Sequence, residues 1–222
     1  MLDDDGSTEE VIAAGLESGV RMNDAKPGPD GTFWAGTMAF EKTSGAAELL
    51  RLGLDRTVTT VVDDLTIPNG LDWSADETLM YFVDTPTGWL DVFDYDADTG
   101  EITNRRHVAD VTGDPTASVA PGRCGVPDGL TLDSEDAIWV AANGAGQVRR
   151  YLSDGHLDLV IDVDASRVTC CCFGDEDLRT LYISTARDGL TDDELDAQPC
   201  SGSLFAVRTE VAGRPPFRFR GG

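Results

Sequence analysis

One unit of sequence recurs along the 222-residue chain and restricts the fold more than any other feature. Each copy opens with a polar residue, continues as a strand, passes through a turn and ends in a strand carrying an aromatic residue. The clearest copy spans residues 126–141, earlier copies open at Asn23 and Asn69, and a degenerate one opens near Cys170. Units of four strands repeating every 40 to 60 residues or so are typical of β-propeller blades. We therefore expect an all-β propeller.

We expect further strands between the copies, the clearest of them at residues 90–95. They lie at residues 48–52, 58–62, 90–95, 102–108, 146–151, 157–161 and 202–207. We also expect a strand at residues 9–13, a surface loop at 112–124 and a long acidic loop at 187–201. No segment predicts a helix and no linker marks a second domain, so residues 1–222 are expected to form one domain. The chain opens like the second half of a hairpin, so we expect it to be incomplete at its N-terminus, with about four to five blades.

The composition is strongly acidic, with 41 Asp and Glu against 17 Lys and Arg and a net charge of −24. Such a charge argues against nucleic acid or an anionic membrane as a partner, and nothing in the sequence calls for an obligate protein partner. The sequence contains no apolar run long enough for a transmembrane helix, and its first five residues lack the features expected of a signal peptide. The five cysteines include no Cys-x-x-Cys pair, so we expect reduced thiols in a cytoplasmic protein.

Aromatic residues fall at equivalent places in the four copies. They are Trp34, Tyr81, Trp139 and Tyr182. Large aromatic side chains dominate the energetics of buried cores. We expect these residues to pack between blades.

Two polar residues follow a proline and precede a glycine at equivalent blade positions. They are Asn69, within Pro68-Asn69-Gly70, and Asp128, within Pro127-Asp128-Gly129. Two oxygen ligands facing a shared axis suit a hard divalent cation such as calcium, magnesium or manganese. Both tripeptides are also typical of turns, and on spacing alone this alternative stays open.

Two other kinds of site are disfavoured. The spacing Asp94-x-Asp96-x-Asp98 resembles the start of an EF-hand loop, but Thr99 and Arg105 stand where the glycine and the closing glutamate are needed. A hairpin turn is the better interpretation. No Gly-x-Ser-x-Gly motif occurs, which disfavours a serine hydrolase.

Several stretches resemble the family of regucalcin (senescence marker protein), gluconolactonase and luciferin-regenerating enzyme. They lie at residues 21–26, 33–38, 67–74, 92–96, 104–106, 126–129, 171–174 and 182–189. The resemblance runs in order from about Arg21 to the C-terminus. It implies a six-bladed β-propeller with one divalent metal ion (calcium, zinc, manganese or magnesium) in its central channel. It also implies a lactonase that hydrolyses an aldonolactone, a small sugar lactone, to the aldonic acid.

The same resemblance assigns roles to residues of this chain. Asn69 and Asp128 match two metal ligands, and Asp128 also matches the general base. Arg21, Asn23 and Glu41 match positions that hold the sugar-lactone substrate. These roles are expectations carried over by motif.

This chain departs from the family pattern in two ways. The third protein ligand of the family is a glutamate in a Gly-Glu-Gly-Pro-type motif, which is absent here. Ala25 and Gly28 replace a usual glycine and aspartate. We therefore expect weak metal binding and weak lactonase activity from this chain alone. Two alternatives stay open, namely a non-enzymatic calcium-binding or regulatory protein on the same scaffold and an inactive fragment.

Overall fold

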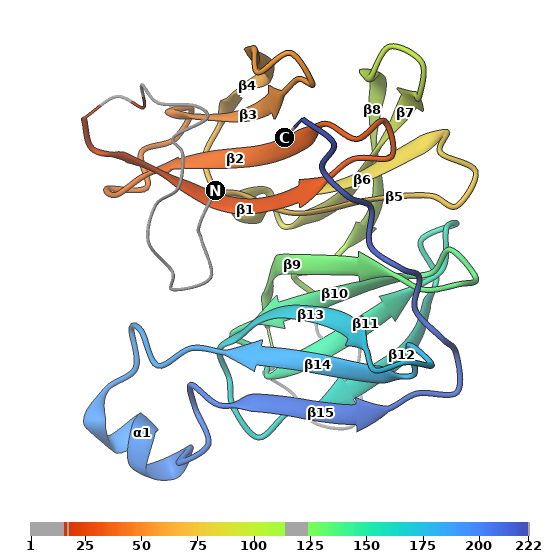
Figure 1. The fold of residues 1–222 in the computed structure, drawn as a ribbon. Coiled ribbons are helices and arrows are strands. Elements are labelled where there is room, and N and C mark those ends of the chain that lie inside the picture. The colour runs from red at the N-terminus through yellow and green to blue at the C-terminus, as the bar shows by residue number, and fades with distance from the viewer. Residues whose placement is uncertain (1–15, 17, 114–123, 222) are drawn as a thin grey trace, which may run out of the picture.

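The structure, a computed structural model, describes residues 16, 18–113 and 124–221. These ranges form four antiparallel sheets, which are the blades of a propeller (Figure 1). The all-β prediction is therefore confirmed, with the blade number at the lower end of the expected range. The strand expected at 9–13 and most of the loop expected at 112–124 lie outside the described residues.

The first two blades each contain four strands paired in chain order. Blade 1 consists of β1 (Val20–Pro27), β2 (Phe33–Ala39), β3 (Ala47–Leu52) and β4 (Val58–Leu65). Blade 2 consists of β5 (Pro68–Trp73), β6 (Leu79–Asp84), β7 (Trp89–Asp96) and β8 (Glu101–Asp110), with a short 3₁₀ helix η1 (Thr85–Thr87) after β6.

The last two blades differ in strand number. Blade 3 consists of β9 (Val126–Leu132), β10 (Ile138–Asn143), β11 (Gln147–Tyr151) and β12 (Leu157–Asp162). Blade 4 consists of β13 (Val168–Gly174), β14 (Thr180–Thr185) and β15 (Leu204–Arg208), with helix α1 (Asp192–Ala197) inserted before β15.

Helix α1 corrects the expectation of a helix-free chain. Thr191 caps its start, because the Thr191 hydroxyl accepts from the Glu194 N–H while the Glu194 carboxylate accepts from the Thr191 N–H. Three acidic residues in the first turn stabilise the helix, because their negative charges lie near the positive end of the helix dipole. The helix buries no residue, so it lacks the apolar periodicity by which longer helices are found. Among the described residues, no helix is long and apolar enough to cross a membrane.

The apolar cores lie between neighbouring blades. Strand β6 shows why, because Met80 and Phe82 join the core with blade 1 while Tyr81 and Val83 join the core with blade 3. A strand covered on both faces requires a continuous apolar run, and residues 79–83 supply one. Trp139 in turn packs in the core between blades 3 and 4.

The expected aromatic positions are buried in three of the four blades. Trp34, Tyr81 and Trp139 are each at most 1% exposed, and Trp34 meets Trp73 of the next blade edge to face with ring centroids 5.8 Å apart. In blade 4 the expectation is wrong for Tyr182, which is only half-buried. Its hydroxyl donates to Asp175 instead.

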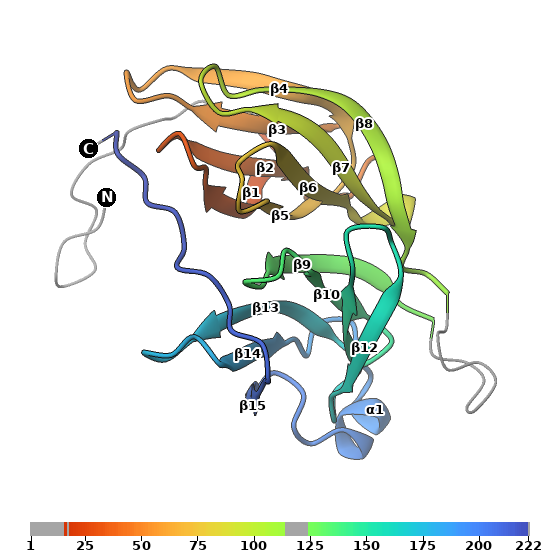
Figure 2. The ribbon, with the colours of Figure 1, turned by 90° about the vertical axis from the view of Figure 1, so that its right-hand side faces the viewer.

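The first strand of each blade lies innermost, and we call β1, β5, β9 and β13 the inner strands (Figure 2). They run side by side around the propeller axis, with β5 between β1 and β9, and β9 beside β13. The other strands of each blade follow outward in order.

Residues 209–221, which we call the C-terminal strap, run from blade 4 back to blade 1 across the hairpins at the ends of the inner strands (Figures 1 and 2). The Gly213 N–H donates to the Leu178 carbonyl of blade 4, and the Ser134 N–H of blade 3 donates to the carbonyl of Ala212. At the far end the Arg220 N–H donates to the Gly31 carbonyl of blade 1. The strap therefore ties together hairpins that are distant in sequence.

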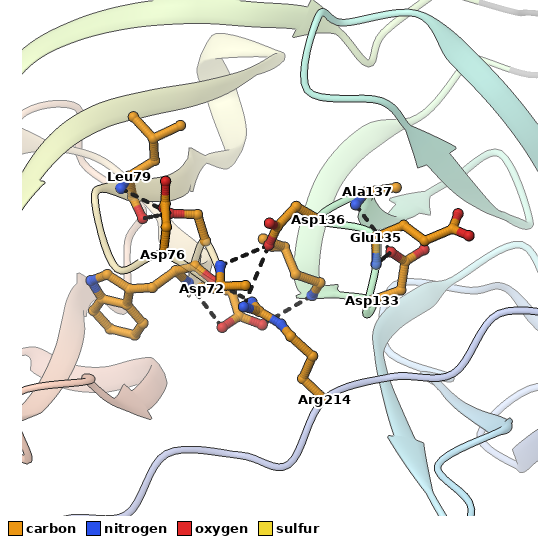
Figure 3. A network of polar contacts seen from close by, with 12 residues as sticks. Asp72, Asp76, Leu79, Asp133, Glu135, Asp136, Ala137 and Arg214 are labelled. Atoms are coloured by element: carbon orange, nitrogen blue, oxygen red, sulfur yellow. Dashed lines mark hydrogen bonds and ion pairs between the residues drawn. The ribbon is translucent and has the colours of Figure 1, made fainter.

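Arg214 fixes the middle of the strap at the junction of blades 2 and 3 (Figure 3). Its guanidinium donates to the Trp73 carbonyl and lies 3.4 Å from the Asp136 carboxylate. Asp136 also accepts from the Ala75 N–H at 2.8 Å, which joins the two hairpins directly. Phe217 then packs edge to face on Trp73.

Candidate functional site

Every inner strand carries one extra residue relative to its partner strand, at the same place in each blade. These β-bulges lie at residues 23–24, 69–70, 128–129 and 169. A bulge redirects side chains, and bulges are frequent beside functional sites. The repeated polar residues of the sequence, Asn23, Asn69 and Asp128, all lie in these bulges.

The glycines after Asn69 and Asp128 allow the inner strands to approach closely. A Cβ atom on Gly70 would lie 2.4 Å from the Leu130 nitrogen, and one on Gly129 would lie 2.5 Å from the Cys170 sulfur. The two tripeptides belong to strands β5 and β9. Their interpretation as turns is therefore wrong, because the glycines provide room for a neighbouring strand.

A chain of hydrogen bonds joins three of the predicted site residues. Arg21 Nη1 donates to Asn23 Oδ1 at 3.0 Å, and Asn23 Nδ2 donates to Asn69 Oδ1 at 2.7 Å. Asn69 Nδ2 donates to Thr85 Oγ1 at 2.7 Å, and the Thr85 hydroxyl donates to the Pro127 carbonyl at 2.8 Å. The chain thus runs from blade 1 through blade 2 to the residue that precedes Asp128.

Asp128 has a half-buried carboxylate with one direct side-chain partner among the described residues. Asn143 Nδ2 donates to its Oδ2 atom at 2.9 Å. Burial raises the pKa of Asp128 to about 6, the charge of Asp24 adds to the effect, and the hydrogen bond from Asn143 opposes it. A carboxylate with such a pKa is basic enough to accept a proton near neutral pH.

Asp24 is an acidic residue that the sequence analysis did not select. It shares the bulge with Asn23, and its Oδ1 atom accepts from the Ala25 N–H at 2.8 Å. Burial raises the pKa of Asp24. Its proximity to Asp128 concentrates negative charge at this end of the inner strands.

Lys26 and Asp72 form an ion pair farther along the inner strands. Their charged atoms are 2.8 Å apart. Lys26 also donates to the Leu130 carbonyl at 3.4 Å, and Asp72 accepts from the Leu132 N–H at 3.0 Å. Burial disfavours the ammonium group, but the Asp72 carboxylate outweighs burial and raises the pKa of Lys26. The pair therefore links β1, β5 and β9.

Glu41 lies in an exposed turn after β2. Strand β2 pairs with β1, where Met38 stands opposite Arg21, so the turn follows closely on that position. Within the described part of the chain, no hydrogen bond or ion pair joins Glu41 to Arg21 or Asn23. Its role in substrate binding stays a prediction.

Cys170 and Cys171 of β13 are held in the thiol form beside this site, because burial raises the pKa of both. Burial raises the pKa of Cys170 to about 12, and the nearby charge of Asp24 adds to the effect. Cys171 is buried, whereas Cys172 is exposed, so the run of three cysteines is not buried throughout.

The family described as SMP-30/Gluconolactonase/LRE-like region matches residues 1–187. The chain belongs to this family. A Bacillus subtilis (strain 168) relative that carries the name of a sugar lactone lactonase, YvrE, is 37% identical over 213 residues, which are 93% of this chain and 68% of that protein. Regucalcin from Oryctolagus cuniculus is 36% identical over 90% of this chain and 67% of its own.

The solved structures include a regucalcin from Agrobacterium tumefaciens, described as a calcium-binding protein. The TM-score between that structure and this protein is 0.82 at 34% identity, and the comparison covers 91% of this chain and 65% of that chain. This likeness supports the propeller fold and the blade order described above. The chain spans about two thirds of the length of these relatives.

Proposed function

We propose that this protein is a metal-dependent sugar lactone hydrolase that opens an aldonolactone to the aldonic acid. The observation that carries the proposal is the half-buried carboxylate of Asp128, which lies in an inner-strand bulge and whose pKa is raised to about 6 in the metal-free protein. A general base is most effective when its pKa lies near the working pH. The gluconolactonase family and the name of the Bacillus relative support a lactone as the substrate.

The cation would be held by the Asn69 amide oxygen and by the Asp128 oxygen that Asn143 does not occupy. Amide and carboxylate oxygens suit calcium, magnesium or manganese. An amide oxygen has two lone pairs, so Asn69 can bind a cation while accepting from Asn23. Among the described residues, no three His, Cys, Asp or Glu side chains are grouped to hold a metal ion, so water would complete the coordination. A bound divalent ion supplies Lewis-acid polarisation of the lactone carbonyl.

The residues of the chain would carry out the proton transfers. Asp128 takes a proton from the water that attacks the carbonyl carbon, and it returns a proton to the ring oxygen as the carbon–oxygen bond of the ring breaks. The guanidinium of Arg21 opposes the negative charge that develops on the carbonyl oxygen. Asn23 and Glu41 bind substrate hydroxyls.

The test is hydrolysis of gluconolactone by the wild-type protein and Asp128→Ala, measured with saturating manganese, zinc, calcium or magnesium in turn. Because general base catalysis contributes about 10²- to 10⁴-fold, we expect Asp128→Ala to lose at least about 10²-fold in turnover. Asp55→Ala, in a distant exposed turn, is the matched control and should keep wild-type turnover. Equal turnover by wild type and Asp128→Ala would contradict the proposal.

A second candidate is a calcium-binding protein without lactonase activity. The Agrobacterium relative is described as a calcium-binding protein, which favours this candidate, as do the oxygen donors of Asn69 and Asp128. Calcium binding by the wild-type protein, lost in Asp128→Ala and accompanied by no lactone turnover with any of the four metals, would establish this alternative.

A further inference from the structure

We propose that Thr85 and Asn143 are positioning residues that orient the two candidate metal ligands, Asn69 and Asp128. The inference rests on the metal site of the proposed function. It does not require that the substrate be a lactone. It concerns residues that no motif marks, and it explains how two side chains on separate strands keep their oxygens available.

Thr85 and Asn143 occupy the same position in consecutive blades. In blade 2 Pro68 pairs with Asp84, and Thr85 is the next residue. In blade 3 Pro127 pairs with Ala142, and Asn143 is the next residue. In both blades the candidate ligand comes directly after the proline, and its contact comes directly after the residue that pairs with the proline. Thr85 thus contacts Asn69, and Asn143 contacts Asp128.

The equivalent positions in the other two blades carry apolar side chains. In blade 1 Met22 pairs with Thr37, so the position is Met38. In blade 4 Val168 pairs with Thr185, so the position is Ala186. Among the four described blades, a hydroxyl or amide side chain stands here only in the two that carry a candidate ligand.

Thr85 determines which way the Asn69 amide faces. The Thr85 hydroxyl donates its proton to the Pro127 carbonyl, so it can only accept from Asn69. The Asn69 NH₂ group must then face Thr85, at 2.7 Å, and its carbonyl oxygen faces the Asn23 side. A cation needs that oxygen and not the NH₂ group.

Asn143 plays the corresponding part for Asp128. Its carbonyl oxygen accepts from Arg167 Nη1 at 3.4 Å, which turns its NH₂ group toward Asp128. The NH₂ group donates a hydrogen bond to Asp128 Oδ2 at 2.9 Å. Among the described residues, Asn143 is the one side chain that donates to this carboxylate, and the Gly129 N–H also interacts with it. We infer that a cation would use the oxygen that Asn143 does not contact.

Fixed orientation should increase cation affinity, because the ligands need not reorganise on binding. Loss of a group that orients a metal ligand typically costs about 10- to 100-fold in affinity. We therefore expect Thr85→Val and Asn143→Leu each to weaken manganese binding by about that factor. Thr85→Ser keeps the hydroxyl and should bind manganese as the wild type does.

The experiment measures the manganese dissociation constant by the electron paramagnetic resonance signal of the free ion. Ala186→Ser, at the equivalent position of blade 4, is the matched control and should leave affinity unchanged. The melting temperature of each metal-free variant distinguishes lost orientation from lost folding. The Thr85→Val and Thr85→Ser pair remains informative if Asn143→Leu does not fold.

Wild-type affinity in a well-folded Thr85→Val would overturn the inference, as would a wild-type protein that binds no manganese. Failure of Thr85→Ser to retain affinity would also count against it. If the wild type binds manganese and the variants weaken it, but no lactone is hydrolysed, the lactonase proposal fails and the positioning roles stand.

Discussion

The carboxylate of Asp128 is held in a place that favours its neutral form. Its folded pKa of about 6 lies above the ordinary value of 3.8, and burial is the main cause. A raised pKa means that the folded state binds the proton more tightly than the unfolded chain does. Ionisation of Asp128 therefore lowers the free energy of unfolding as the pH rises from about 4 to above 6, by about 3 kcal/mol in total.

This predicts that Asp128→Asn raises stability while it removes activity. At pH 8 we expect the metal-free variant to unfold at higher urea concentration than the wild type, with a gain of up to about 3 kcal/mol that vanishes at pH 4. Urea titrations at both pH values measure the gain. The control Asp55→Asn should behave oppositely, because hydrogen bonds from Thr57 lower the pKa of Asp55 and its ionised form stabilises the fold. A variant less stable than the wild type at pH 8 would show that charged Asp128 does not strain the fold.

Part of the site could be predicted residue by residue from the sequence. The repeated Pro-Asn-Gly and Pro-Asp-Gly tripeptides marked Asn69 and Asp128, and the repeat also marked Asn23. Thr85 and Asn143 could not be selected in this way, because their importance depends on strand register. Once the pairing of residues 126–132 with 138–143 is known, Asn143 lies at the end of the strand opposite Asp128, and this is the signal that would have found it.

The inner strands are the elements on which the site depends, and their close approach is set by glycine. A Cβ atom on Gly70 would meet the backbone of β9, with the Leu130 nitrogen at 2.4 Å and the Asp128 carbonyl oxygen at 2.8 Å. Backbone atoms in paired strands cannot move aside cheaply. Any side chain at Gly70 must therefore push β5 away from β9.

We predict that Gly70→Ala destabilises the protein by about 1 to 3 kcal/mol, the usual cost of inserting a methyl group into a packed region. It should also weaken metal binding, because Asn69 and Asp128 are carried by the two strands that separate. Urea unfolding and manganese titration measure the two effects. Gly113→Ala is the control, since a Cβ atom there meets no described residue within 4 Å. Equal stability of Gly70→Ala and wild type would mean that β5 and β9 accommodate a methyl group without separating.

Strands proved easier to predict than the interruptions between them. The recurring unit and the segments between its copies located the expected strands of all four blades. Helix α1 was not predicted because a six-residue acidic helix has no apolar face. Its capping residues, Thr191 and Glu194, are the sequence signal that indicates it. The bulges were also not predicted, because an extra residue is defined only against the partner strand.

At the scale of the whole molecule, the C-terminal strap contacts all four blades and packs against two of the inter-blade cores. Phe217 of the strap packs on Trp73 with ring centroids 6.3 Å apart, and Phe219 packs on Phe33 at 6.0 Å. Arg214 adds polar contacts to the hairpins of blades 2 and 3. The strap therefore contributes apolar burial and hydrogen bonds that no single blade provides.

We predict that Phe217→Ala lowers the free energy of unfolding by about 1 to 3 kcal/mol, less than a fully buried phenylalanine would lose because Phe217 is half-buried. Phe40→Ala is the control, since Phe40 is 62% exposed. Urea unfolding compares the two variants, and hydrogen exchange of the hairpin amides at residues 133–137 reports local loosening. A Phe217→Ala protein as stable as Phe40→Ala would show that the strap is only loosely attached.

The strap should also affect the folding and unfolding kinetics of the protein. It is the last described segment to be synthesised, and Arg214 contacts the carbonyl of a residue 141 positions earlier in the chain. Contacts between such distant residues close large loops and tend to form late in folding. We therefore expect the blades to assemble on their inter-blade cores before the strap binds. Interactions absent from the folding transition state slow unfolding without accelerating folding. The strap should thus determine how long the assembled propeller persists, while the cores determine how fast it forms.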